Sequence, residues 1–164
     1  MIGEILSHTP IWVFVLFIAL VAIGLSQVRA RSLSAARLFA LPVAMVGFSL
    51  YGFVSAFGSS PFATAGWLVG LLVTSSLIVA ARFPRGVTYS AQTFRIPGSW
   101  IPFFVIMAIF FSRYVITVAL TMTPALRGIA AVAAGVGAIY GLSSGFFVGR
   151  TLTALRAMRA PAPA

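Results

Sequence analysis

The sequence predicts an all-α integral membrane protein, in which five transmembrane helices form one bundle with the N-terminus outside and the C-terminus in the cytoplasm. Three observations support this fold class. The chain is 61% hydrophobic and only 7% charged, whereas a soluble domain carries about 25% charged residues. It contains apolar runs of the length that a membrane-crossing helix needs, roughly 17–25 residues. Nearly all of its arginines lie in the segments between alternate runs.

The first helix is predicted at about residues 10–27. No charged residue lies inside this apolar run, and the first positive charges, Arg29 and Arg31, follow it. A secretory signal peptide has its positive charges before the apolar run, whereas the segment before this one carries Glu4 and no arginine. We therefore expect a retained membrane helix whose C-terminal end is cytoplasmic.

The second and third helices share one charge-free stretch, from Leu38 to Ala81. This stretch is too long for a single span, and it contains Gly-Ser-Ser at residues 58–60, followed by Pro61. A turn of this composition, with proline at the first helical position, separates two helices. The expected helices cover about residues 38–57 and 61–81 and are joined by a short outer loop.

The fourth and fifth helices are predicted at about residues 100–121 and 126–148. Pro124 lies in the short loop between them, where proline is tolerated because the amides of a helix's first turn have no intrahelical partner. Residues 1–159 would then form a single transmembrane domain. The alanine- and proline-rich tail at 160–164 is expected to be disordered.

The arginines set the orientation, because cytoplasmic loops of membrane proteins carry an excess of lysine and arginine. An outside N-terminus leaves Arg127 outside and Arg113 within a span, and places the others in the cytoplasm, namely Arg29, Arg31, Arg37, Arg82, Arg85, Arg95, Arg150, Arg156 and Arg159. We expect these inner-loop arginines to meet anionic phospholipid headgroups. The same rule explains the net charge of +10, so nucleic acid is not an expected partner.

The composition offers little for catalysis. The chain has no cysteine, one histidine and one acidic residue, which excludes thiol chemistry, an aspartyl pair and a site of several histidines around a metal. No glycine-rich nucleotide-binding fingerprint follows a predicted strand. We therefore expect a non-enzymatic protein without a metal or cofactor.

Glycines recur every four residues along the fifth predicted helix, which leaves one of its faces nearly free of side chains. The row is Gly137, Gly141, Gly145 and Gly149, and a shorter row on the third helix holds Gly66 and Gly70. Small residues at this spacing let helix backbones approach closely in a bilayer. The face can serve packing within one chain, or it can form the seam of a homo-oligomer or of a complex with another membrane protein. The second use predicts a structural or accessory subunit.

Arg113 lies inside the fourth predicted helix between apolar residues, and a charge at this depth needs a partner. The predicted topology places several polar or aromatic side chains in the same outer half of the membrane, and the candidate ligand-binding residues are Arg113, Glu4, His8, Tyr51, Tyr114 and Trp67. The alternative hypothesis is thus a ligand-binding or transport protein with an outward-facing polar pocket around Arg113. A structural role is the favoured alternative, in which Arg113 extends to the interface or pairs with Glu4.

Four segments resemble a family of small bacterial inner-membrane proteins of unknown function. They are His-Thr-Pro-Ile-Trp-Val-Phe at 8–14, Ser-Leu-Tyr-Gly at 49–52, Ile-Pro-Gly-Ser-Trp-Ile-Pro at 96–102 and Ile-Phe-Phe-Ser-Arg-Tyr at 109–114. The resemblance covers nearly the whole chain. It implies a compact multi-pass protein of the bacterial inner membrane with a basic residue at the position of Arg113, and it brings no known activity.

Overall fold

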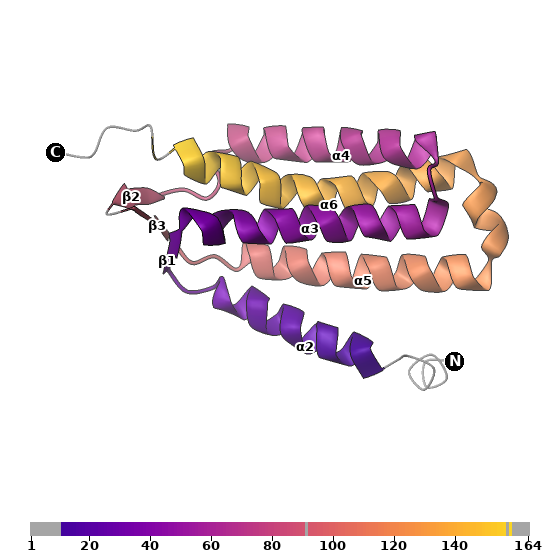
Figure 1. Ribbon diagram of the computed structural model, residues 1–164, viewed down its shortest axis with the longest axis horizontal. Coiled ribbons are helices and arrows are strands. Elements are labelled where there is room, and N and C mark those ends of the chain that lie inside the picture. Colours follow the sequence, from indigo (N-terminus) through magenta and orange to yellow (C-terminus); the bar gives the residue numbers. More distant parts are fainter. Residues whose placement is uncertain (1–10, 91, 157, 159–164) are drawn as a thin grey trace.

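The computed structural model of the protein describes residues 11–90, 92–156 and 158 (Figure 1). Within them the chain forms five α-helices, which are α2 (Ile11–Ser26), α3 (Ala35–Phe57), α4 (Pro61–Ala80), α5 (Ile101–Met122) and α6 (Ala130–Arg156). The 3-10 helix η1 (Pro124–Gly128) joins α5 to α6. The predicted tail at 160–164 lies outside the described residues.

Four of these helices, α3 to α6, are long and apolar enough to cross a membrane. Each corresponds to one of the predicted spans, so the expected helical membrane architecture is confirmed at this level. The first predicted span is also an apolar helix, but α2 has only 16 residues. At 1.5 Å per residue it extends about 24 Å.

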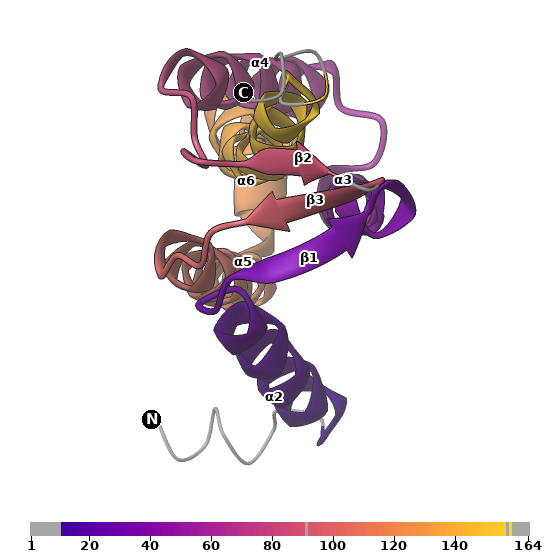
Figure 2. The same cartoon turned by 90° about the vertical axis from the view of Figure 1, so that its left-hand side faces the viewer.

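The helices form two groups that lie against each other (Figures 1 and 2). In the first group, α6 packs closely on α4 and also on α3. In the second group, α2 packs on α5. The contacts between α5 and the first group are much sparser. An apolar cluster around Ile106 of α5 and Phe146 and Phe147 of α6 nevertheless connects the two groups.

The glycine row of α6 is the reason that α4 and α6 pack so closely. A Cβ atom added to Gly137, Gly141 or Gly145 would overlap a backbone carbonyl oxygen of α4. The converse holds for Gly66 and Gly70, where an added Cβ would overlap carbonyl oxygens of α6. The two backbones touch directly, which only glycine permits on both sides of the seam. This face of α6 is therefore covered by α4 of the same chain.

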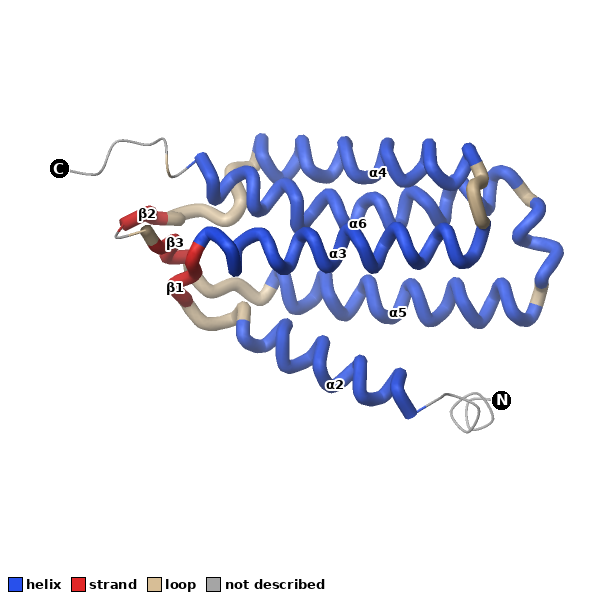
Figure 3. Tube along the Cα trace, viewed as in Figure 1, coloured by secondary structure: helices blue, strands red, loops and turns tan. Residues whose placement is uncertain are grey.

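A three-stranded antiparallel sheet closes one end of the bundle (Figures 2 and 3). It contains β1 (Arg31–Ser34), β2 (Thr88–Ser90) and β3 (Thr93–Ile96), in the order β1-β3-β2. We call this end the sheet end. The three strands lie in segments between predicted helices, where no strand is expected from the sequence. Along β3 the side chains alternate, because Phe94 and Ile96 are buried against the bundle while Thr93 and Arg95 face outward.

Two helix boundaries differ from the predicted ones. The fifth helix is predicted at 126–148, but η1 occupies its expected start and α6 runs from Ala130 to Arg156. Arg150 is therefore inside a helix and not in a segment after it. Helix α3 begins at Ala35, directly after β1, so that Pro42 lies within the helix instead of at its start. The sheet explains this early start, because it ends the preceding loop at Ser34.

Candidate functional site

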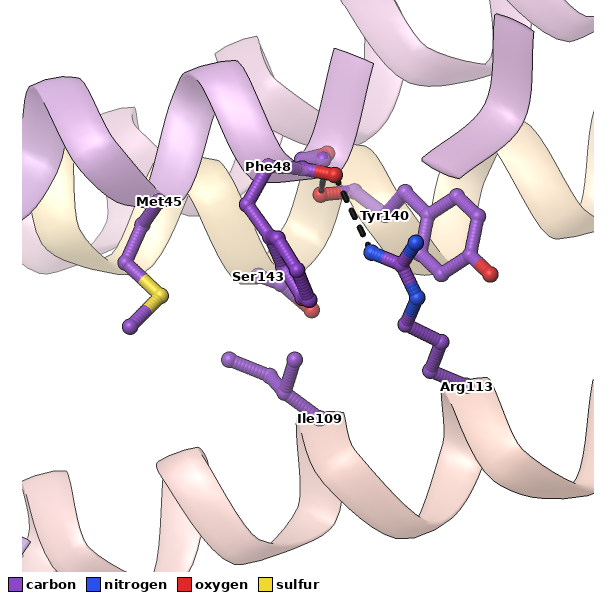
Figure 4. Close-up of a pocket in the computed structure, with 7 residues that line it drawn as sticks. Met45, Phe48, Ile109, Arg113, Tyr140 and Ser143 are labelled. Carbon is purple, nitrogen blue, oxygen red and sulfur yellow. Dashed lines mark hydrogen bonds between the residues drawn. The ribbon is translucent and has the colours of Figure 1, made fainter. Parts of the chain in front are cut away.

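Arg113 extends from the middle of α5 toward α3 and α6 (Figure 4). Its Nη1 donates a hydrogen bond to the backbone carbonyl oxygen of Phe48 at 3.1 Å. Its guanidinium carbon lies 3.9 Å from the centre of the Phe48 ring and 6.0 Å from that of Tyr140. Both arrangements are favourable for a cation over an aromatic face. Arg113 therefore connects the two helix groups.

A glycine makes room for this guanidinium group. A Cβ atom added to Gly52 would lie 3.1 Å from Nη1 of Arg113 and 3.3 Å from a ring carbon of Tyr140. An added Cβ at this position would require the guanidinium group and the Tyr140 ring to move by a few tenths of an ångström. The Ser-Leu-Tyr-Gly segment thus contributes to the site through its glycine and serine, while Tyr51 is 68% exposed and faces away.

The space beside Arg113 is small. The cavity has a volume of about 10 Å³ and is lined by Met45, Phe48, Ser49, Ile109, Arg113, Tyr140 and Ser143. A volume of roughly 10–15 Å³ holds a single water molecule. The cavity cannot take a larger ligand without a change of structure. In this conformation Arg113 therefore links α5 to α3 and α6 and does not face a ligand-sized pocket.

Of the other predicted pocket residues, none that the structure describes lines this cavity. Trp67 is buried in the core, where its Nε1 donates to Ser49 Oγ at 2.9 Å, and Ser49 Oγ donates to the Tyr140 carbonyl oxygen at 3.0 Å. These two bonds join α4, α3 and α6. Tyr114 is partly exposed on α5 and has a partner of its own. Glu4 and His8 lie outside the described residues, and so does any pairing of Arg113 with Glu4.

A second polar cluster lies at the sheet end and was not predicted. It is centred on Gln27, which is only 1% exposed although it follows an apolar helix. Its Oε1 accepts a hydrogen bond from Arg150 Nη1 and another from Arg31 Nη2, the latter at 3.1 Å. We call Gln27, Arg31 and Arg150 the basic cluster. It connects the end of α2 and the start of β1 to α6.

The basic cluster carries two positive charges around one neutral oxygen. Arg150 is 6% exposed, and neither its Nε nor Gln27 Nε2 has a hydrogen-bond partner among the described residues. Burial lowers the pKa of Arg31 below its ordinary value. Buried charges are normally paired with an opposite charge, whereas no salt bridge balances these two within the described part of the chain.

A cavity of about 30 Å³ adjoins the basic cluster. Its basic lining consists of Arg31, Arg37 and Arg150, and the remainder is mostly apolar, with Leu33, Leu38, Leu41, Pro42, Ile96, Phe147 and Thr151. One sequence feature hints at this site, since Gln27 is the only side-chain amide at the end of an apolar run. Nothing in the sequence indicates that it meets Arg150.

Six exposed arginines lie together at the sheet end, namely Arg29, Arg37, Arg82, Arg85, Arg95 and Arg156. Arg150 belongs to the same end but is buried. Among the residues that the structure describes, no group of three or more potential metal ligands is brought together.

The contacts of Arg113 with α3 and α6 are expected to stabilise the protein. Replacing Arg113 with glutamine removes the bond to Phe48 and the stacking on two rings, so we expect the protein to lose about 1–3 kcal/mol of stability. The midpoint of thermal unfolding in an uncharged detergent measures this loss. The control is Arg127→Gln, which removes the same charge from an exposed position. Equal midpoints for the two variants would show that the contacts of Arg113 with α3 and α6 do not stabilise the protein.

Comparison with known proteins identifies a family and no individual relative. The model of a family of unknown function, DUF6622, matches residues 1–164. This confirms the resemblance to a family without known activity that the sequence motifs indicate. No curated protein and no solved structure matches the chain.

Proposed function

We propose that this chain, which belongs to DUF6622, a family of unknown function, is a non-enzymatic accessory protein of the bacterial inner membrane. In this role it stabilises or positions other membrane proteins and does not itself move or convert a substrate. The observation that carries the proposal is that Arg113 is bound within the protein. A charged residue at this depth commonly marks a substrate path, but here it is consumed in contacts between α5, α3 and α6.

The small size of the cavity beside Arg113 also supports an accessory role. The adjoining cavity, at about 10 Å³, is far below the roughly 300–1,000 Å³ of ordinary small-molecule sites. The seam between α4 and α6 is closed by direct backbone contact. These features favour an accessory role over a ligand-binding or transport protein with a pocket at Arg113.

The proposed orientation places the sheet end in the cytoplasm. The exposed arginines of the described chain gather there, apart from Arg127 near the opposite end, as the positive-inside rule requires. Helix α2 runs toward the sheet end (Figure 1), so a crossing by α2 puts the N-terminal side outside. Its length of about 24 Å is compatible with a hydrocarbon core of about 30 Å if the bilayer thins locally.

In this proposal the glycine row of α6 serves packing within the chain and does not form the seam of an oligomer. Because α4 already covers the face with Gly137, Gly141 and Gly145, a partner or a second copy has to use another surface of the bundle. The accessory role therefore does not depend on this row, except that the row holds the protein itself together.

Native mass spectrometry on the full-length protein, extracted gently from its own membrane, tests the proposal. We expect a complex of defined stoichiometry, with a second membrane protein or with further copies, that retains no non-lipid molecule whose binding depends on Arg113. The Arg113→Gln variant should form the same complex. A strictly monomeric protein would contradict the accessory role. A non-lipid molecule that the wild type retains and Arg113→Gln loses would instead favour binding or transport.

A further inference from the structure

The basic cluster at the sheet end places two positive charges around a single neutral acceptor. Arg31 and Arg150 both donate to Gln27 Oε1, and a neutral oxygen cannot offset two positive charges. The only acidic residue in the chain is Glu4, which lies outside the described residues. A buried guanidinium group such as that of Arg150, next to the half-buried Arg31, is expected to have a negative charge nearby.

Two buried hydrogen-bond donors without an acceptor among the described residues also indicate that the site needs a further acceptor group. Arg150 Nε and Gln27 Nε2 are buried and have no acceptor in the part of the chain that the structure describes. Buried donors are rarely left without an acceptor. Arg150 also lines the adjoining cavity of about 30 Å³, so an acceptor placed in that cavity lies next to the Arg150 side chain.

The cavity has a basic wall and an apolar wall. Arg31, Arg37 and Arg150 form the first, and Arg37 is exposed, which places it at the opening. Leu38, Leu41 and Phe147 contribute to the second wall, among others. Its volume of about 30 Å³ is two to three times the roughly 10–15 Å³ that one water needs, so two or three oxygen atoms of one group fit inside it.

We propose that this cavity binds a phosphate group, held by the guanidinium groups of Arg31 and Arg150 inside and of Arg37 at the opening. The planar guanidinium fork matches the spacing of phosphate oxygens and can donate two parallel hydrogen bonds. Three such groups around one cavity favour an anion with several acceptors over a single-atom anion. The phosphate can belong to a phospholipid headgroup or to a soluble phosphate compound.

The test uses the full-length protein in a maltoside detergent, which contains no phosphate. Short-chain phosphatidylglycerol is titrated in one arm and inorganic phosphate in the other, and native mass spectrometry measures the bound fraction. The informative variant is Arg37→Gln, because Arg37 is exposed and its replacement leaves the buried residues in place. The matched control is Arg85→Gln, which removes an exposed charge from the same end of the protein but outside the cavity.

We expect saturable binding in at least one arm, weakened about tenfold in Arg37→Gln by the loss of one charge-assisted hydrogen bond. Arg85→Gln should bind as the wild type does. Binding in the lipid arm alone identifies a headgroup phosphate, and binding in the inorganic arm identifies a soluble one. The proposal is overturned if neither probe binds saturably, or if the two variants weaken binding equally, since general attraction to positive charge would then suffice.

This inference does not depend on the accessory role. An accessory protein without the phosphate site would show its partner complex but no dependence on Arg37. A phosphate-binding protein that is strictly monomeric would show phosphate binding that depends on Arg37 but no partner complex. Either proposal can therefore be contradicted while the other stands.

Discussion

Replacing Gly141 with leucine is expected to separate α4 from α6 and leave little correctly folded protein. A Cβ atom at this position would overlap the carbonyl oxygen of Trp67 and approach the backbone nitrogen of Leu71. Backbone atoms cannot move aside as a flexible side chain can, so a leucine here forces the two helices apart. Overpacking of an ordinary core costs about 1–3 kcal/mol, occasionally more, and the rigid backbone places this case at the upper end.

Size-exclusion chromatography of a fluorescent fusion, together with the midpoint of thermal unfolding, measures the effect. The matched control is Gly135→Leu on the same helix, because an added Cβ there meets nothing within 4 Å. That control should fold normally and can even gain stability, since glycine costs a helix about 1 kcal/mol relative to alanine. If Gly141→Leu elutes and unfolds like Gly135→Leu, the seam between α4 and α6 is not the main source of stability.

The second large effect is expected at Gln27, where two substitutions should shift stability in opposite directions. Gln27→Leu removes the only acceptor that Arg31 and Arg150 share. Each hydrogen bond to a charged group contributes about 1.5–3 kcal/mol, so the thermal midpoint should fall clearly. Gln27→Glu supplies a negative charge at the same place, and charge-assisted bonds should raise the midpoint.

Comparing these two variants separates charge from packing, because leucine and glutamate both retain much of the volume of glutamine. A rise with Gln27→Glu would show that the basic cluster of the wild type lacks a counter-charge. The same variant should bind phosphate more weakly than the wild type, since its carboxylate occupies the role of the anion. A lower midpoint for Gln27→Glu than for Gln27→Leu would mean that the cluster is not short of negative charge.

Features with local causes were predictable from the sequence. An apolar run of sufficient length becomes a helix wherever it lies, and Pro61 marks the start of α4 as expected. The spacing of Gly137, Gly141 and Gly145 places them on one face of any helix, so close packing on that face could be expected. The accumulation of arginines in alternate segments is likewise a property of the sequence itself.

The partners of the polar residues could not be predicted. Arg113 finds the backbone carbonyl oxygen of Phe48, and such an acceptor has no sequence signal because every residue carries one. The sequence suggested Glu4 or a side-chain pocket instead. Trp67, predicted beside Arg113, is used to bridge α4 to α3 through Ser49, because α4 packs on α6 and not on α5.

The sequence by itself thus determined a helical membrane protein, the limits of most of its helices, and the face on which two of them can meet. The tertiary structure decided which helices are neighbours, and with that the chemistry of the sheet end. Gln27 and Arg150 are 123 residues apart in the chain, and they meet only because α2 and α6 end beside the same sheet. Contacts of this kind depend on the path of the whole chain, whereas helix formation depends on a few neighbouring residues.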